Sequence, residues 1–173
     1  MNNEEEDLKK KEREEWIESQ WKIVKSIYFR AYKGRAHYAD ISDIEHHMRF
    51  FDYIQKERTD MADYLRDVVE DTDWTIEQIA AEGICPKVVE AVKYLVRQSN
   101  ETFMQYVERV AQNDIAALVT QSYILDGLEI IRFKSLTKYD FNYLNTLLEA
   151  YHYLDNLEQQ KWDKEHYKDL IDE

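Results

Sequence analysis

Residues that interrupt helices are scarce in this sequence of 173 residues, which contains one proline and three glycines. So few helix breakers, together with many Glu, Lys, Leu and Ala residues, favour helices joined by short loops. Cysteine is nearly absent as well: Cys85 is the only one, and this excludes an internal disulfide. No His lies near Cys85 in the sequence, so we interpret this thiol as unreactive and not as a catalytic nucleophile.

Long apolar runs and an excess of basic charge are also missing. No stretch is apolar enough to span a bilayer, and the first residues, MNNEEEDLKKK, lack the apolar core of a signal peptide. The formal net charge is −13, and such an excess of acid repels nucleic-acid backbones and anionic membrane surfaces. We therefore expect a cytoplasmic protein with no nucleic-acid partner and no membrane partner.

The sequence does contain a persistent pattern of amphipathic helices. Hydrophobic residues make up 44% and charged residues 34%, which is typical of one soluble globular domain. Apolar residues recur at helical spacing in one segment after another. The first helix is expected over residues 5–33, and later helices are expected to begin near Ser42, Asp60, Thr75, Pro86, Asn100, Asp114 and Thr137. The predicted fold class is all-α, a single multi-helix domain.

The most informative segment runs from Ala62 to Ile79 and reads ADYLRDVVEDTDWTIEQI. It resembles the second-helix signature of the HD phosphohydrolases of the RelA/SpoT type. In that family, aliphatic residues, a His-Asp pair and the run Glu-Asp-Thr-Asp precede a capped helix. Those enzymes hydrolyse guanosine tetra- and pentaphosphate alarmones, typically with manganese. The resemblance implies an HD-like fold.

Further segments agree with the family in order and spacing from Ile27 to Leu154. They are Ala31–Arg35, Ile44–Arg49, Gly83–Val92, Glu101–Arg109 and Leu136–Asp140. On this resemblance, residues 1–26 are expected to form an N-terminal helix with a charged start, packed on the domain. Residues 27–154 are expected to form the HD-like domain, and residues 155–173 the end of the last helix and an acidic tail.

The resemblance also places four metal ligands, and two of them are replaced in this chain. His46 and Asp67 match the first and third ligands, whereas the second, a His, falls on Arg66 and the fourth, an Asp, falls on Tyr123. Arginine keeps its positive charge and offers no lone pair, and tyrosine is bulky and normally protonated. The replacements therefore remove two donors that the family uses to hold a divalent ion.

Other family positions persist or change. The catalytic acidic pair is present as Glu70 and Asp71, while Tyr32 replaces an early His of the family. Arg49 closes the segment that matches Ile-x-His-Pro-Leu-Arg. We predict that the former pocket is lined by Arg66, Tyr123, Arg49 and Tyr32.

The replacement at Arg66 leads to a specific hypothesis. We expect its guanidinium to stand in for the charge of the metal and to pair with Asp67, Glu70 or Asp71. Without such a partner, the acidic pocket would be destabilised by repulsion between its carboxylates. If the pair is buried, removing Arg66 should lower the free energy of unfolding by about 3–5 kcal/mol.

The expected function is that of a pseudoenzyme, a non-hydrolytic HD-type domain that acts as a regulatory, nucleotide-sensing or protein-interaction module. No cofactor is expected. Inactive hydrolase domains of the family precede a synthetase domain, which this sequence does not show, so a protein target would act in trans. The alternative is an active phosphohydrolase on guanosine tetraphosphate or another nucleotide, with Mn²⁺ or another divalent metal held by His46 and Asp67.

Two further readings use composition. The high acidity fits a protein that blocks a basic partner by charge.

The sequence has 13 tyrosines, and those of the last expected helix fit either an interaction surface or half-buried core residues with exposed hydroxyl groups. These are Tyr139, Tyr143, Tyr151 and Tyr153.

Overall fold

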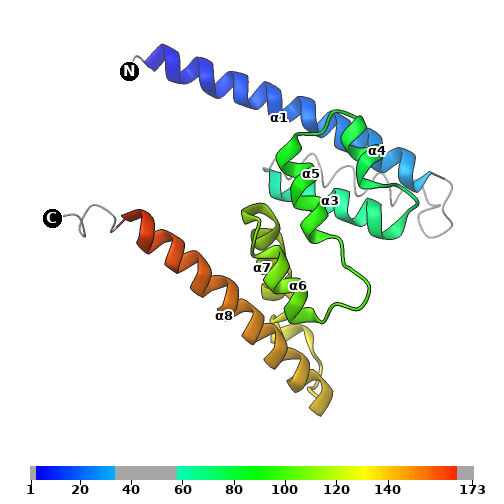
Figure 1. Cartoon of the computed structure of the whole chain (residues 1–173), viewed down its shortest axis with the longest axis vertical. Coiled ribbons are helices and arrows are strands. Elements are labelled where there is room, and N and C mark those ends of the chain that lie inside the picture. Colours follow the sequence, from blue (N-terminus) through cyan, green and yellow to red (C-terminus); the bar gives the residue numbers. More distant parts are fainter. Residues whose placement is uncertain (1–2, 34–57, 167–173) are drawn as a thin grey trace. The chain divides into compact units, whose positions relative to one another are not determined.

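A computed structural model describes residues 3–33 and 58–166 of the chain (Figure 1). Within these ranges all regular secondary structure is helical, with no strand, so the all-α prediction is confirmed. The helix expected to begin near Ser42 lies outside the described residues. No helix among the described residues has both the length and the apolar composition needed to cross a membrane.

The chain divides into two compact units, residues 1–96 and residues 97–173. The boundary at Val96 and Arg97 falls inside the range 27–154, which the family resemblance treats as one domain. No glycine or proline marks this position, and the short polar run that follows it, residues 98–102, resembles an ordinary loop between helices. The two units are described separately below.

The first unit is built from four described helices. They are α1 (Asn3–Tyr32), α3 (Arg58–Asp71), α4 (Ile76–Ala81) and α5 (Pro86–Leu95). Helix α3 packs against both α1 and α5, and α4 packs against α5 (Figure 1). Only the second half of α1 joins this core, because its side chains from Leu8 to Trp16 are exposed. The fully buried residues of the unit include Val24, Ile27, Met61, Leu65, Val88 and Leu95.

Local signals in the sequence position α4 and α5 as expected. Thr75 and Gln78 form a reciprocal capping box at the start of α4. After that helix, Gly83 adopts a φ of 86°, a left-handed conformation that glycine tolerates without strain. Pro86 then begins α5, where its missing N–H is not needed.

The turn between α4 and α5 is tied to α1 by one buried side chain. The Gln20 Oε1 atom accepts a hydrogen bond of 2.7 Å from the backbone N–H of Cys85. The Nε2 atom of the same side chain donates to the carbonyl oxygen of Gly83 at 3.5 Å. Gln20 thereby satisfies two backbone groups of a turn more than sixty residues away.

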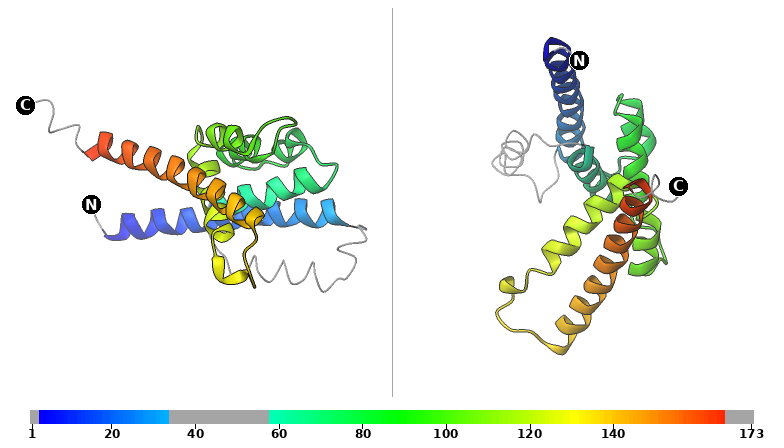
Figure 2. Two further views of the ribbon diagram at one scale, coloured as in Figure 1. Left: turned by 90° about the horizontal axis from the view of Figure 1, so that it is seen from below. Right: turned by 90° about the vertical axis from the view of Figure 1, so that its left-hand side faces the viewer.

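The second unit contains α6 (Phe103–Val110), α7 (Asp114–Gly127), the short 3₁₀ helix η2 (Ile130–Arg132) and α8 (Lys138–His166). Helices α6 and α8 both pack against α7, and α6 also contacts α8. Helices α7 and α8 run in roughly opposite directions (Figure 2). The core residues of the second unit include Val107, Val110, Ala116, Ile124, Leu144, Leu147, Ala150 and Leu154.

Two of the three helices expected in this unit have their N-caps one or two residues from the expected starts at Asn100 and Asp114. The side chain of Thr102, not Asn100, caps α6, while Asn100 adopts a φ of 72° in the preceding turn. The side chain of Asn113, not Asp114, caps α7. Each prediction chose one of two adjacent or nearby residues that are both good caps. Thr137 does accept a hydrogen bond from the backbone N–H of Asp140 at the start of α8, as expected.

Candidate functional site

One face of α3 carries a stripe of charged side chains. Asp63, Arg66, Asp67 and Glu70 are spaced three or four residues apart, so they share one side of the helix. The core side of α3 is formed by Met61, Ala62, Leu65 and Val68. This amphipathic pattern places the charged stripe at the edge of the first unit.

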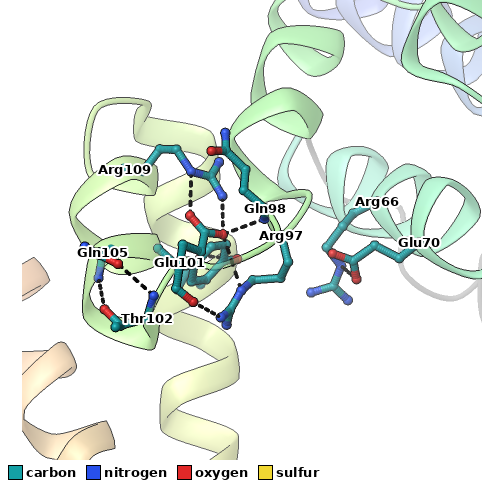
Figure 3. A network of polar contacts seen from close by, with 10 residues as sticks. Arg66, Glu70, Arg97, Gln98, Glu101, Thr102, Gln105 and Arg109 are labelled. Atoms are coloured by element: carbon teal, nitrogen blue, oxygen red, sulfur yellow. Dashed lines mark hydrogen bonds and ion pairs between the residues drawn. The ribbon is translucent and has the colours of Figure 1, made fainter.

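The guanidinium of Arg66 binds three carboxylates of this stripe. Its Nη2 atom lies 2.6 Å from Asp67 Oδ1 and 3.2 Å from Asp63 Oδ1. Its Nε atom lies 3.2 Å from the same Asp67 oxygen and 3.8 Å from Glu70 Oε2. Figure 3 shows the Arg66 and Glu70 side chains extending toward each other along the helix. The expected pairing of Arg66 with Asp67 and Glu70 is therefore confirmed.

Asp63 is a partner that the sequence prediction omitted. Its position three residues before Arg66 was the available signal, because side chains at this spacing meet on a helix. The Arg66 side chain is only 14% exposed, whereas those of its three partners are 31–40% exposed. The cluster thus consists of a largely buried guanidinium surrounded by partly hydrated carboxylates. As a whole it is less buried than the ion pair considered in the sequence analysis.

Asp71 accepts a different hydrogen bond, from the end of α1. The Tyr32 hydroxyl donates to Asp71 Oδ2 at 3.1 Å, and the Tyr32 side chain is almost fully buried. Its ring packs on that of Tyr28, with centroids 4.5 Å apart. Burial and the nearby Tyr28 and Asp71 raise the pKa of the Tyr32 phenol well above its usual value. Tyr32 therefore remains protonated and joins α1 to the acidic end of α3.

The described part of this site pairs its carboxylates with Arg66. Asp67 Oδ1 already accepts two N–H groups from Arg66, and the guanidinium itself offers no lone pair to an ion. Among residues 3–33 and 58–166, no three His, Cys, Asp or Glu side chains are grouped in a way that could hold a metal. The expected ligand His46 and the expected pocket residue Arg49 lie outside the described residues.

The remaining predicted site residue, Tyr123, belongs to the second unit. It lies on α7, and its side chain is 44% exposed. Its expected place beside Asp67 stays a prediction. The structure therefore brings together Tyr32, Arg66, Asp67, Glu70 and Asp71 in the first unit.

The second unit has its own arginine–carboxylate cluster, shown in Figure 3. Arg109 on α6 donates to both oxygens of Glu101, at 2.7 and 3.0 Å. The backbone N–H of Gln98 donates to Glu101 at 2.7 Å. The guanidinium groups of Arg97 and Arg109 both lie over the ring of Tyr106, at 4.7 and 5.5 Å from its centroid. This cluster holds the loop before α6 against that helix.

No protein-family model matches this sequence, and no curated protein matches it. The resemblance to the HD phosphohydrolases therefore rests on the motifs quoted above and stays a prediction.

Proposed function

We propose that this protein is a non-hydrolytic HD-type domain that regulates a target by binding a ligand or a protein in trans. The observation that carries the proposal is the Arg66 cluster, in which a guanidinium pairs with three carboxylates. By the family resemblance, this position would hold a metal-binding His. A fixed positive side chain balances the acidic stripe without a metal ion. Hydrolysis of the HD type requires electron-pair donors at this place, which arginine does not supply.

The geometry of Asp67 supports the same proposal. In a working site of this kind, the carboxylate next to the second ligand must be open to the ion. Here Asp67 Oδ1 accepts N–H groups from both Nε and Nη2 of Arg66. A cation that approached Asp67 would have to displace the guanidinium and would then be repelled by it.

The runner-up is a phosphohydrolase that uses Mn²⁺ or another divalent metal. The observation in its favour is the retained acidic pair at the end of α3, where Asp71 is oriented by the buried Tyr32 hydroxyl. In this alternative Glu70 and Asp71 would move protons, and His46 and Asp67 would hold the ion.

Two measurements on the purified chain separate these functions. Metal content is determined by elemental analysis, and phosphate release from guanosine tetraphosphate is followed with Mn²⁺. We expect no stoichiometric metal and no turnover from the natural sequence. Stoichiometric metal together with turnover would establish the hydrolase and overturn the proposal.

A restored variant sharpens the test. Arg66→His with Tyr123→Asp returns the two missing donor types, and we expect it to bind Mn²⁺ more tightly than the natural chain. Arg66→Lys serves as the matched control, because lysine keeps the charge and also lacks a free lone pair. Equal Mn²⁺ affinity of the restored variant and the control would contradict the proposed family relationship, whatever the function.

A further inference from the structure

The connection between α7 and α8 concentrates the basic charge of a long stretch of the second unit. In residues 110–160 the only Lys and Arg residues are Arg132, Lys134 and Lys138, whereas seven Asp and Glu residues lie in the same stretch. Residues 130–139 read IIRFKSLTKY and contain no acidic residue. We call this segment the basic loop. Its positive charge contrasts with the net charge of −13 of the whole chain.

The basic loop also exposes large apolar side chains. Ile130 and Ile131 on η2 are 56% and 86% exposed, and Tyr139 at the start of α8 is 79% exposed. The side chains of Lys134 and Lys138 are exposed as well. Isolated exposed apolar residues are common on proteins, but several of them in one ten-residue segment, together with exposed lysines, mark an interaction site.

The packing of α7 on α8 holds the basic loop in place. Gly127 ends α7 beside α8, where an added Cβ atom would lie 2.7 Å from Leu147 Cδ1. Within the loop, Phe133 and Leu136 are half-buried, and the backbone N–H of Phe133 donates to the carbonyl oxygen of Ile130 at 3.0 Å. These contacts anchor the loop to its unit, while the isoleucines of η2 remain open to solvent.

The acidic residue that follows the basic loop is engaged elsewhere. The Asp140 Oδ2 atom accepts hydrogen bonds from the backbone N–H and the hydroxyl of Thr137, both at 2.7 Å, and so caps α8. Among the side chains described in residues 3–33 and 58–160, no carboxylate forms an ion pair with Lys134 or Lys138. The charge of the loop is therefore open to a partner from outside the chain.

Charge and side-chain type indicate the class of this partner. A positive surface with aliphatic side chains matches an acidic protein segment that carries apolar residues. A single-stranded nucleic acid is also negative, but its bases bind by stacking on aromatic rings. The most exposed apolar residue of the loop, Ile131, is aliphatic and offers no ring. The loop therefore suits a protein segment better than a nucleic acid.

A membrane and a second copy of the chain fit less well. An anionic bilayer is broad, and it repels a chain with a net charge of −13. A second copy brings the same net charge to the contact. A short segment of another protein contacts the loop alone, and charges more than about 8–10 Å away are largely screened at physiological salt.

We propose that the basic loop binds an acidic segment of another protein that carries aliphatic or aromatic side chains. The apolar side chains of that segment contact Ile130 and Ile131, and its carboxylates approach Lys134 and Lys138. The proposal concerns the second unit alone, so it stands whether or not the Arg66 site hydrolyses a nucleotide.

The test uses the full chain and two labelled synthetic peptides of about 15 residues, which in extended form exceed the reach of the ten-residue loop. Both carry the same Leu and Phe residues, and the intervening positions are Asp and Glu in one peptide and Ser and Gln in the other. Fluorescence anisotropy at low salt should show that the acidic peptide binds about tenfold more tightly than the neutral one. The net charge of −13 alone predicts the opposite order. Moderate salt should weaken the acidic peptide only.

Variants that remove positive charge locate the site on the protein. The loop variant replaces three basic residues by glutamine: Arg132→Gln, Lys134→Gln and Lys138→Gln. The control variant removes the same charge from exposed positions of α1: Lys9→Gln, Lys10→Gln and Lys11→Gln. The loop variant should lower the affinity for the acidic peptide by about tenfold and leave the neutral peptide unaffected, whereas the control variant should leave both affinities nearly unchanged.

A second pair of variants tests the apolar contact. Ile131→Ser should lower the affinity for both peptides about fivefold, because its side chain is the most exposed apolar one of the loop. Leu8→Ser, at a residue that is 59% exposed on α1, is the control and should leave both affinities unchanged. Circular dichroism checks the folding of each variant, and this pair decides the question if the loop variant misfolds.

Four results would overturn the proposal. The first is an acidic peptide that binds no more tightly than the neutral one, or not at all at about 100 µM, a concentration that detects even weak complexes. The second is an equal effect of the loop variant and its control. The third is loop-dependent binding of phosphatidylserine vesicles or of a single-stranded oligonucleotide without binding of the acidic peptide. The fourth is a concentration-dependent dimer in sedimentation that disappears in the loop variant, which would identify a second copy as the partner.

Discussion

The two arginine clusters of this protein differ in what they connect. Arg109 and Glu101 are eight residues apart and join a loop to a helix through two hydrogen bonds to both carboxylate oxygens. All three carboxylates of the Arg66 cluster lie within four residues of Arg66 on the same helix. The Arg109 cluster therefore stabilises the fold of its unit, whereas the Arg66 cluster chiefly balances the charge of one helix face.

Exposure strengthens this contrast. The Glu101 side chain is 9% exposed, so it depends on Arg109 and Gln98 for its hydrogen bonds. The acidic partners of Arg66 are about one-third exposed, and water screens their repulsion when the arginine is removed. Arg66 thus contributes little to stability but occupies the carboxylate of Asp67. The proposed loss of catalysis requires an arginine of this kind.

The largest expected effect is at the Arg109 cluster. Arg109→Ala should lower the free energy of unfolding by about 2 kcal/mol, because the nearly buried Glu101 carboxylate loses two hydrogen bonds and its remaining guanidinium contact is the longer one to Arg97, at 3.4 Å. Urea denaturation followed by circular dichroism measures the change. A double-mutant cycle with Glu101→Gln should show a coupling well above that of an exposed pair. Independent, additive effects would remove the distinction between the two clusters.

Lowering the pH should weaken the stabilisation that the pair of Arg109 and Glu101 contributes. The hydrogen bond from Arg109 lowers the pKa of Glu101 in the folded chain. The stabilisation is therefore present above the unfolded pKa of about 4.3 and is lost as the pH falls through the lower folded value. Melting temperatures between pH 3 and 6 should fall less steeply for Glu101→Gln than for the natural chain.

A smaller effect is expected at Arg66. Arg66→Ala should lower the free energy of unfolding by about 1 kcal/mol, less than the 3–5 kcal/mol expected for a fully buried pair, and added salt should restore part of the loss. Lys22→Ala, which breaks an exposed pair with Glu18, is the control and should change stability much less. A melting temperature that is unaffected by Arg66→Ala would end the charge-balancing hypothesis.

The hydrogen bond from Tyr32 should contribute a similar or slightly smaller amount. Tyr32→Phe removes the hydroxyl and should cost about 1 kcal/mol, because Asp71 loses a donor from a different helix. The raised pKa of Tyr32 also stabilises the fold below the unfolded pKa of about 10, and this contribution is lost as the pH rises further. Alkaline denaturation should therefore be less steep in Tyr32→Phe, and an unchanged alkaline transition would argue against a buried, protonated Tyr32.

The smallest effect on stability is expected at two exposed leucines of the second unit, Leu125 on α7 and Leu148 on α8. Leu125→Ser with Leu148→Ser should change the free energy of unfolding by about 0.5 kcal/mol or less, since both side chains are already largely in contact with water. Thermal denaturation measures this change. A large loss of stability would show that these leucines belong to the core.

The sequence predicted the helices of the first unit well because several local signals agreed there. The capping box at Thr75, the glycine at position 83 and Pro86 each act within a few residues, so their effects do not depend on tertiary structure. The pairing of Arg66 with Asp67 and Glu70 was predictable for the same reason, since helical spacing alone brings these side chains together.

The buried face of α8 was harder to predict. Phe141, Leu144 and Leu148 have the spacing of one apolar stripe, but Phe141 and Leu148 are exposed, and Leu147 and Ala150 are buried with Leu144. Apolar residues surround this helix, so periodicity alone does not single out one face. Which face is buried depends on contacts with α6 and α7, and these contacts are not encoded in local spacing.

The boundary between the two units escaped prediction for a related reason. Linkers are recognised by glycine, proline or small polar residues. The polar residues Ser99, Asn100 and Thr102 follow the boundary at Val96 and Arg97, but they look like any loop between two helices and do not by themselves indicate a second unit. The tyrosines of α8 give an intermediate outcome: Tyr139 and Tyr143 are exposed, whereas Tyr151 and Tyr153 are half-buried. The first two fit the surface interpretation and the last two fit the core interpretation.

The link between Gln20 and the turn after α4 has a consequence for local opening of the first unit. The amide proton of Cys85 is held by a side chain of α1 and not by a neighbour in its own turn. Its hydrogen-exchange rate should therefore report when α1 detaches, even if α4 and α5 keep their helical bonds. A partner or a substitution that loosens α1 should appear first at this one amide.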